Sequence, residues 1–412
     1  MPEPVYLIAT ARTDFKRNLK KEGKSLRDAI VEPGRDALLA SGLDPKDLGA
    51  GVVGNFAAGL FTRQLHLGAF LTEIDESLRG LPTSHVEGAC ASGSLAVIQA
   101  IQLIAGGIHD AVLVVGAEQQ KTMSSSDGGD VLAAAGDFHY ERPQYGDFMF
   151  PKLFGRIAES HMKKCGLTER QLAVVAAKNY AHAKLNPLAQ MRENAMTVDY
   201  ANTVSEKNPV IASPLRLSDC SQITDGGAAL VIVSGKMLAK LGHSGPKVRL
   251  LGYGVSTDHL RLEDKQMPEF PIARLAAQRA YTMSGIKPND ADGVEVHDCF
   301  SITEVVATEL LGLAPMGRGG ELAESGATSL PQVRESLGLP KLATKVIPVN
   351  AGGGLIADGH PVGGTGVRQV VEAATQLRGE AGARQIENAK TYLTFNMGGS
   401  LTTSVVMAWG RE

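Results

Sequence analysis

Short apolar runs alternate with helical patterns along most of this 412-residue chain, and this alternation constrains the fold more than any other feature. Several runs are apolar at every position, which is typical of strands buried between two layers of helices. Strands that alternate with helices predict an α/β fold with a mainly parallel sheet. We expect strands over 5–10, 50–56, 83–86, 111–117, 228–234, 247–254, 293–298, 345–350, 391–396 and 402–409, and helices over 25–41, 93–106, 153–165, 169–184, 270–284, 301–313 and 364–378.

The order of these elements repeats within the chain. CASGSLAVIQAIQLIAGG, followed by AVLVVGAE, has the same plan as GHPVGGTGVRQVVEAATQLRG, followed by TYLTFNMGG: a glycine-rich turn, a helix and a strand. The sequence therefore predicts two similar halves, an N-terminal half over 1–120 and 215–244 and a C-terminal half over 245–412. Residues 121–214 form an insertion in the first half, which we expect to cover the substrate.

Charge and hydropathy argue against several classes of protein. The net charge of -3 lacks the basic excess of a nucleic-acid-binding protein. No apolar run approaches the ~18 residues needed to cross a bilayer, and the first residues lack the features of a signal peptide. The four cysteines are few and widely spaced, as expected of reduced thiols, and no pair has zinc-ribbon spacing. We therefore expect a cytoplasmic protein with no nucleic-acid partner, no membrane insertion and no metal.

Cys90 stands in GACASGS, where a predicted strand turns into an apolar helix. A thiol at a helix N-terminus lies at the positive end of the dipole, which lowers its pKa and favours the nucleophilic thiolate. The free backbone N–H groups there can also hold an oxyanion. The alternative is a small buried core thiol, which is the usual place of a cysteine.

The stretch VEVHDCFSITEV carries a second group of reactive side chains at the end of a predicted strand. His297 and Cys299 are two residues apart, so along an extended backbone they share one face, whereas Asp298 points the other way and could bond to the structure. Ser301 and Glu304 have the spacing of a capping box. The carboxyl end of a parallel strand is where α/β sheets keep their chemistry. The alternative is a strand-end cysteine in the core.

Two glycine-rich turns complete the candidate residues. His360 in GHPVGGTG is held between a glycine and Pro361, which suits a general base or an oxyanion contact. The alternative is a loop histidine bonded to a carbonyl. In FNMGGS, Gly398 and Gly399 offer backbone N–H groups without side-chain hindrance, and the alternative is a plain β-turn. The chain has no phosphate-binding loop and no dinucleotide-binding G-x-G-x-x-G after a strand, so nucleotide hydrolysis and NAD chemistry have no support.

Taken together, GACASGS, HDCF, GHPVGGTG and NMGG, in this order, resemble the motifs of the thiolase superfamily. HDCF, KNYAHAKLNPLAQ and SPLRLSDCSQITDGGAALV resemble the sterol-carrier-protein-2-type thiolases in particular. The resemblance implies a thiolase-like five-layer α/β/α/β/α fold built from two similar halves, with a loop domain inserted in the first half. The chain stops just after its last predicted strand, so we expect no fused sterol-carrier domain.

The resemblance also implies a role for each reactive group. Cys90 would be the acyl-accepting nucleophile, and His360 would activate it and help to hold a thioester oxygen. Cys299 would be the acid/base that moves a proton to or from the substrate. His297 would form the other side of that oxyanion site, and the N–H groups of Cys90 and Gly398 would form a second oxyanion hole. The sequence singles out no further ligand-binding residues.

One departure bears on these roles, because better-known thiolases carry their acid/base cysteine in a final C-x-G where this chain has Asn396. Cys299 would then have to supply the second thiol. The implied activity is a CoA-dependent acyltransferase that cleaves a 3-ketoacyl-CoA, or runs the reverse Claisen condensation, through an acyl-cysteine. CoA would be a co-substrate, with no permanently bound cofactor.

The resemblance further implies a homodimer or homotetramer that binds acyl-CoA and CoA, with a small accessory subunit as an open alternative. Two other functions also stay open. One is a retro-aldolase or condensing enzyme of the thiolase fold that acts with a partner subunit. The other is a non-catalytic acyl-CoA-binding subunit.

Overall fold

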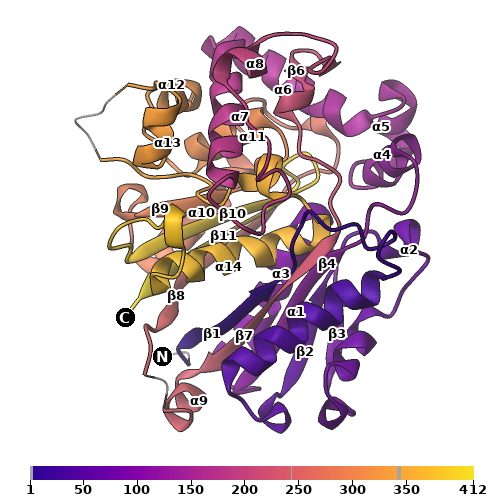
Figure 1. Ribbon diagram of the computed structural model, residues 1–412, viewed down its shortest axis with the longest axis vertical. Coiled ribbons are helices and arrows are strands. Elements are labelled where there is room, and N and C mark those ends of the chain that lie inside the picture. The colour runs from indigo at the N-terminus through magenta and orange to yellow at the C-terminus, as the bar shows by residue number, and fades with distance from the viewer. Residues whose placement is uncertain (1–2, 243, 341–344) are drawn as a thin grey trace.

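The computed structural model describes residues 3–242, 244–340 and 345–412. Nine strands form one mixed sheet in the order β3-β2-β4-β7-β1-β8-β11-β10-β9 (Figure 1). Among the strand pairs of this sheet that the structure describes, five are antiparallel and three are parallel, so the prediction of a mainly parallel sheet was wrong. The strands are β1 (Val5–Arg12), β2 (Ala50–Gly54), β3 (Thr83–Val86), β4 (Ala111–Glu118), β7 (Gly226–Ser234), β8 (Val248–Thr257), β9 (Gly293–Val296), β10 (Thr391–Gly398) and β11 (Thr403–Arg411), and β5 (Val210–Ala212) with β6 (Leu215–Arg216) forms a separate two-stranded sheet.

The large sheet consists of two parts with the same internal order. The part β3-β2-β4-β7-β1 comes from the first half of the chain, and the part β9-β10-β11-β8 comes from the second. The two parts are joined where Tyr6 and Leu7 of β1 pair with Arg249 and Val248 of β8. Val349 makes an isolated parallel bridge to β9. It lies on the side of β9 away from β10, which is the place that β3 takes beside β2 in the first part.

This arrangement confirms the expectation of two similar halves, because corresponding strands occupy corresponding places in both parts of the sheet. The strand expected over 345–350 was wrong, since only the bridge at Val349 is present. Pro348 lies beside this bridge and has no N–H to donate to a ladder, which limits the pairing of this segment. The residue limits proposed for the halves and the insertion stay a prediction.

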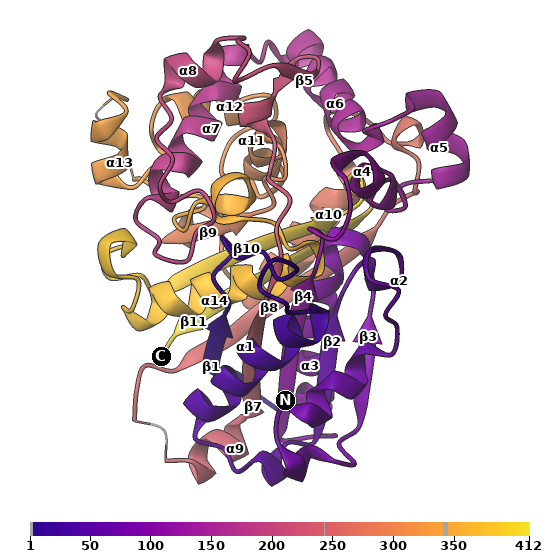
Figure 2. The same ribbon diagram turned by 45° about the vertical axis from the view of Figure 1, so that its right-hand side comes forward.

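Helices cover both outer faces of the sheet and fill the space between its two parts (Figures 1 and 2). Helix α1 packs on β1, β4 and β7, and α10 packs on β8 and β11. Helices α3 and α14 contact each other, α3 packs on β2 and β4, and α14 packs on β10 and β7. The layers therefore run α/β/α/β/α, as expected. The bounds are α1 (Leu26–Ser41), α3 (Ser92–Ala105), α10 (Pro271–Ser284) and α14 (Thr365–Arg378).

A second group of helices lies above the sheet in Figure 1 and combines the insertion with part of the second half. Helix α7 of the insertion contacts α11 and α12 of the second half, so the insertion does not stand apart. The helices that the sequence did not predict have between four and nine residues. The remaining bounds are α2 (Ala58–Phe61), α4 (Ser125–Ala133), α5 (Phe138–Tyr145), α6 (Met149–Cys165), α7 (Glu169–Ala183), α8 (Val198–Asn202), α9 (Gly235–Lys240), α11 (Ser301–Leu310), α12 (Gly319–Glu324) and α13 (Pro331–Ser336).

The start of α11 differs from the expected capping box. Ser301 is the first residue of the helix, and its hydroxyl donates to Asp219 Oδ1 at 2.6 Å instead of capping the helix. Glu304 is buried and forms an ion pair with Lys178 at 2.6 Å. The prediction was wrong because both side chains have partners from distant parts of the chain. Among the helices that the structure describes, none is both long and apolar enough to cross a membrane.

Candidate active site

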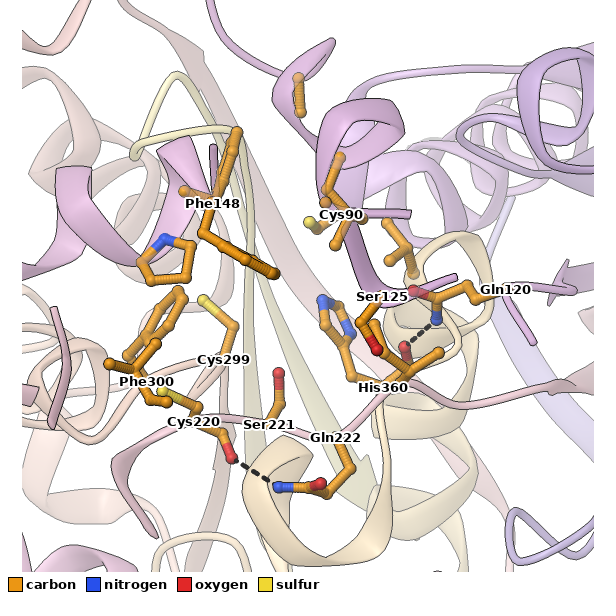
Figure 3. Close-up of a pocket in the computed structure, with 18 of the residues that line it drawn as sticks. Cys90, Gln120, Ser125, Phe148, Cys220, Ser221, Gln222, Cys299, Phe300 and His360 are labelled. Carbon is orange, nitrogen blue, oxygen red and sulfur yellow. Dashed lines mark hydrogen bonds between the residues drawn. The ribbon is translucent and has the colours of Figure 1, made fainter. Parts of the chain in front are cut away.

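Loops from both halves of the chain meet at a cavity of about 240 Å³. Cys90 follows β3, Cys299 follows β9, and His360 precedes α14, and all three line this cavity (Figure 3). His297 lies beside them, with its ring centroid 5.1 Å from that of His360. The structure therefore brings together the four reactive side chains that the sequence singled out. Gly398 ends β10 close by, packed against the backbone of the turn that carries Cys90.

Cys90 is presented by a tight turn between β3 and α3. Ala89, the preceding residue, has a φ of 52°, a left-handed conformation that is uncommon for residues other than glycine. Ser92 fixes this turn, because its hydroxyl accepts from Gly88 N at 3.0 Å and donates to Ala89 O at 2.6 Å. A short 3₁₀ turn over Ala89–Ala91 then leads into α3. Such a strained turn between a strand and a helix places the thiol at the surface of the cavity.

Small residues allow the two central helices to approach closely enough to join Cys90 and His360 in one site. A Cβ added to Gly93 would lie 2.7 Å from Gly363 O and 3.1 Å from Gly366 N. A Cβ added to Gly366 would likewise overlap Ser94. Only glycine fits these crossing points, so the GACASGS and GHPVGGTG motifs have a packing reason as well as a chemical one.

His360 is held with a free ring nitrogen. Its Nδ1 lies 2.6 Å from Thr365 Oγ1, and that hydroxyl donates to Pro361 O at 3.2 Å, so Nδ1 carries the proton and Nε2 keeps a lone pair. Its backbone is bound on both sides, since Thr224 Oγ1 accepts from His360 N and Gln120 donates to His360 O. Burial lowers the pKa of His360 to about 3, so the ring is neutral and able to accept a proton.

His297 has the opposite arrangement. The side-chain amide of Asn396 donates to His297 Nδ1 at 2.9 Å, so the proton of the neutral ring lies on Nε2. Burial lowers the pKa of His297 well below its ordinary value, and the neighbouring His360 lowers it further. One neutral histidine thus offers a base and the other offers a hydrogen-bond donor. Asn396, which replaces the cysteine of the better-known motif, sets the donor form of His297.

The thiols of Cys90 and Cys299 are protonated in the substrate-free protein. Burial raises the pKa of Cys90 to about 12, and the Glu118 carboxylate raises it further. The N–H of Gly399 faces the sulfur and tends to lower this pKa. Burial raises the pKa of Cys299 well above its ordinary value, and Cys90 adds to that rise. The sequence predicted a lowered pKa for Cys90. Burial outweighs the helix dipole because the dipole contributes only about 0.3–1 kcal/mol, less than the cost of a buried thiolate.

Alkylation of Cys90 should therefore depend steeply on pH. Because its pKa is raised to about 12, the thiolate fraction is far from saturation near neutrality. We expect the rate of iodoacetamide labelling, followed by peptide mass spectrometry, to rise about tenfold per pH unit between about pH 7 and pH 9. A labelling rate that levels off near neutral pH would instead indicate a stable thiolate–imidazolium pair and would contradict this assignment.

Asp298 points away from the cavity, as expected, and ties two of the site loops together. Its carboxylate accepts from Leu355 N at 2.6 Å and Ile356 N at 3.3 Å, in the π-helical turn that leads to His360. Asn179 of α7 donates to the same carboxylate at 2.7 Å. The turn that carries His297 and Cys299 is thus fixed to the turn that carries His360.

Lys178 and Asn179 support this connection from the insertion. Asn179 donates to Glu304 Oε2 at 2.9 Å as well as to Asp298, and Lys178 pairs with Glu304. All four side chains are buried. Asn179 and His182, both on α7, are buried and support the site from below. His182 Nδ1 lies 2.9 Å from Asn350 O.

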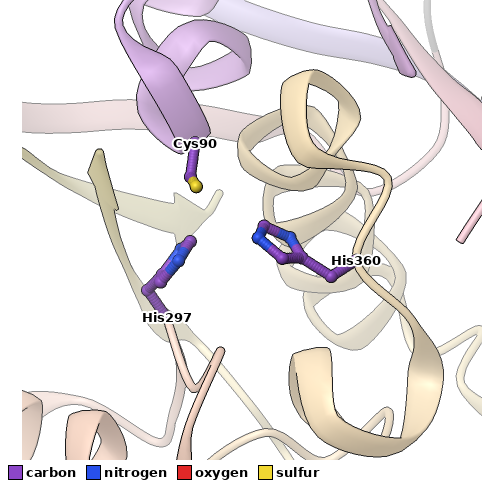
Figure 4. A group of neighbouring side chains, drawn as sticks. All are labelled: Cys90, His297 and His360. Carbon is purple, nitrogen blue, oxygen red and sulfur yellow. The ribbon is translucent and has the colours of Figure 1, made fainter. Parts of the chain in front are cut away.

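Three of the reactive side chains also have the composition of a metal site. Cys90, His297 and His360 each offer one ligand atom, and these atoms lie within 4.8 Å of one another (Figure 4). Thiolate and imidazole are ligands that zinc prefers, although structural zinc sites use four of them.

Several residues of the site were not singled out by the sequence. Cys220 lines the cavity, and its sulfur lies 3.3 Å from Arg216 O. Glu118 lies under the site, where it accepts from Phe56 N, Ala57 N, Gly363 N and the amide of Asn55. Burial raises the pKa of Glu118 to about 7. The available signal was the position of Glu118, which directly follows the strand predicted over 111–117 and is the last residue of β4.

Comparison with protein families decides which family this fold and site represent. The thiolase N-terminal domain model matches residues 5–236, and the thiolase C-terminal domain-like model matches residues 254–411. The chain belongs to the thiolase family. The predictions of a thiolase and of its fold are therefore confirmed.

Full-length relatives support the same assignment. This thiolase is 37% identical over 388 residues to an acetyl-CoA acetyltransferase of Methanothermobacter thermautotrophicus, covering 94% of this chain and 95% of that protein. It is 30% identical over 408 residues to human sterol carrier protein 2, covering 96% of this chain and 70% of that protein. The match to the sterol-carrier-protein-2 subgroup agrees with the HDCF motif.

Solved structures share the fold of this thiolase. The Ltp2-ChsH2(DUF35) aldolase superposes over 99% of this chain and 98% of that chain, with a TM-score of 0.79 and 22% identity. Human mitochondrial 3-ketoacyl-CoA thiolase in complex with CoA superposes over 100% of this chain and 98% of that chain, with a TM-score of 0.71 and 17% identity. At these identities the similarity establishes the fold alone.

Proposed function

We propose that this thiolase is a CoA-dependent acyltransferase that cleaves a 3-ketoacyl-CoA, or runs the reverse Claisen condensation, through an acyl group on Cys90. The observation that carries the proposal is the arrangement, around one cavity, of the Cys90 and Cys299 thiols with two neutral histidines. His360 offers an acceptor nitrogen and His297 offers a donor. This set supplies a nucleophile, a base, an oxyanion contact and a second acid/base.

The first half-reaction forms the acyl-enzyme. His360 Nε2 takes the thiol proton as Cys90 attacks the keto carbon of the substrate. The N–H groups of Cys90 and Gly398 stabilise the oxyanion that forms there, and the N–H of Gly399, which faces the sulfur, is a further donor. The bond between the keto carbon and the α-carbon breaks, and acetyl-CoA leaves as an enolate. Cys299 donates a proton to the α-carbon of that enolate.

The second half-reaction transfers the acyl group to CoA. During the first half-reaction, His297 Nε2–H and His360 hold the thioester oxygen of the departing enolate. Acetyl-CoA then leaves the site, and free CoA takes its place. The Cys299 thiolate takes the proton of the CoA thiol, which attacks the acyl carbon. Cys90 leaves as a thiolate and recovers its proton from protonated His360. Two thiols are needed because one carries the acyl group while the other handles the proton.

The cofactor use, cellular location, oligomeric state and domain limits of the enzyme are also part of this proposal. CoA acts as a co-substrate, and no permanently bound cofactor takes part. We place the enzyme in the cytoplasm, in acyl-CoA and lipid metabolism, and expect it to form a homodimer or homotetramer. The proposed domain limits are 1–120 and 215–244 for the N-terminal half, 121–214 for the insertion, and 245–412 for the C-terminal half. The family-model matches, which end at residue 236 and resume at residue 254, support a join near 244. A small accessory subunit is compatible with the assembly named for the Ltp2-ChsH2(DUF35) aldolase.

The other two functions have less support from the site. A non-catalytic binding subunit needs no reactive groups, yet Cys90, His297, Cys299 and His360 all lie at one cavity. A decarboxylating condensing enzyme has no use for a second catalytic thiol, so the placement of Cys299 speaks against it. Turnover by the chain without a partner separates thiolysis from a partner-dependent aldolase.

Steady-state kinetics of the purified chain test the proposal. With 3-ketoacyl-CoA and CoA varied together, a covalent acyl-enzyme predicts parallel lines in double-reciprocal plots, the pattern of ping-pong kinetics. Acetyl-CoA and the shortened acyl-CoA should appear in equal amounts. A folded protein that turns over no 3-ketoacyl-CoA, from short to long and branched, would contradict the proposed function.

A further inference from the structure

The cavity beside Cys90 has walls without charge. Among the described residues that line it, none is an aspartate, glutamate, lysine or arginine. One wall is the face of α4 formed by Ser125, Gly129 and Leu132, which are spaced by four and three residues and therefore lie on one side of the helix. The insertion thus contributes a mostly apolar surface to the cavity that the reactive thiols line.

The rim of the cavity exposes large apolar side chains to solvent. Phe148 is 44% exposed, Leu217 is 39% exposed, and Ile211 and Ile223 are each 37% exposed, and all four line the cavity. Apolar side chains that gather around a concave site mark a surface that a ligand covers. An apolar group bound between them would remove this surface from water.

The polar groups of the cavity walls cannot neutralise a charged ligand, and most of their hydrogen-bond donors already have partners within the protein. The amide of Gln120 already donates to Thr224 O at 2.8 Å and to His360 O at 2.7 Å. The amide of Gln222 donates to Cys220 O at 3.3 Å. The hydroxyls of Ser125 and Ser221 remain, but hydroxyls do not balance a full charge. A carboxylate in this cavity would lose its water without gaining a cation.

We propose that the acyl group carried by Cys90 is apolar, uncharged and larger than acetyl, a straight or branched chain of about four to eight carbons. This inference rests on the proposed acyl transfer. The size agrees with the cavity of about 240 Å³, which holds the acyl group beside the reacting end of CoA. An acetyl group is too short to cover the apolar walls from α4 and Phe148. The charge follows from the absence of ionic side chains among the described lining residues.

Two substrates of equal length test the charge of the acyl group. 3-Ketoadipyl-CoA is 3-ketohexanoyl-CoA with its terminal methyl replaced by a carboxylate, and we expect its kcat/KM to be lower by about 100-fold or more because the carboxylate is left unpaired. Acetoacetyl-CoA tests the length. Its acyl group lacks two methylenes, each worth about fourfold, so 3-ketohexanoyl-CoA should exceed it roughly 15-fold.

The outcomes separate this inference from the proposed function. Equal or faster turnover of 3-ketoadipyl-CoA, or a preference for acetoacetyl-CoA, would overturn the inference and leave acyl transfer intact. Turnover of none of the three by folded protein would overturn the acyl-transfer function and this inference with it.

Substitutions in the cavity wall test where the acyl chain binds. A Cβ at Gly129 would lie 3.3 Å from Phe148 Cδ1, so Gly129→Leu fills the space between α4 and Phe148. It should lower the kcat/KM ratio of 3-ketooctanoyl-CoA to acetoacetyl-CoA about tenfold or more, and Phe148→Ala should raise that ratio. Gly128→Ala is the matched control, because Gly128 is the adjacent helical glycine and does not line the cavity.

The paired variants also guard against a folding defect. Phe148→Ala only removes atoms and is expected to fold. The ratio of kcat/KM values can therefore still be measured in this variant if Gly129→Leu does not fold. Ratios that change equally in the Gly128 and Gly129 variants, or that move in the same direction in the Gly129 and Phe148 variants, would overturn the placement of the chain.

Discussion

Replacing Cys90 with alanine is expected to remove thiolysis, with a loss of roughly 10⁴-fold or more in kcat. The thiol is the only group in the proposed reaction that becomes covalently bound to the acyl carbon, and no water or neighbouring hydroxyl reproduces that step. The change removes one buried sulfur at the cavity surface, so the fold should persist. The measurement is the rate of 3-ketoacyl-CoA cleavage with CoA, alongside the unfolding temperature.

Cys165→Ala is the matched control for this variant. Cys165 ends α6, is partly buried and does not line the cavity. It should keep the wild-type rate, which separates loss of the nucleophile from loss of any cysteine. A Cys90→Ala protein that retains more than about a hundredth of the wild-type rate would not fit a covalent mechanism.

Replacing Cys299 with alanine should slow cleavage by about 10²–10⁴-fold, the usual contribution of a general acid or base. Cys90→Ala should prevent formation of the acyl-enzyme, whereas Cys299→Ala should mainly prevent proton exchange at the α-carbon. Without Cys299 no group at the α-carbon gives or takes the proton. Cys90 can still receive an acetyl group from acetyl-CoA, more slowly than in the wild type, because CoA can leave as a thiolate. The expected result is a protein that becomes acetylated yet exchanges the methyl hydrogens of acetyl-CoA for deuterium very slowly.

Cys299→Ser distinguishes acidity from packing. Serine keeps a similar shape and can still approach Thr303 Oγ1, which lies 3.9 Å from the Cys299 sulfur. A hydroxyl is a much weaker acid than a thiol, so the serine variant should lose nearly as much exchange as the alanine variant. Deuterium exchange at the wild-type rate in either variant would remove Cys299 from the proton-transfer role.

The regular elements of this fold could be predicted because their signals are local. The apolar runs of β4, β7, β10 and β11 and the helical patterns of α3 and α14 appear in the sequence where the structure has them. Their repeated order also indicated the two halves. The strand expected over 345–350 failed because its pairing depends on the edge of β9 and on Pro348. The capping box failed because Asp219 and Lys178, both distant in sequence, bind its two members.

The candidate site could be predicted in composition but not in electrostatics. Short motifs identified Cys90, His297, Cys299 and His360, and all four meet at the cavity. The direction of the Cys90 pKa could not be foreseen, because burial is a property of the packed chain and exceeds the local effect of a helix terminus. The opposite proton positions on the two histidines depend on Thr365 and Asn396. The shape of the cavity wall likewise arises only when the insertion folds onto the second half.

The central claim is a covalent acyl group on Cys90, and intact-protein mass spectrometry tests it most directly. Wild-type protein and Cys90→Ala are incubated with acetoacetyl-CoA or 3-ketohexanoyl-CoA in the absence of free CoA, and the modified peptide is then identified. We predict one acyl group on the wild type, located on Cys90, and none on the variant. An acyl group on another residue, equal labelling of both proteins, or no label on folded wild type with either substrate would contradict the account.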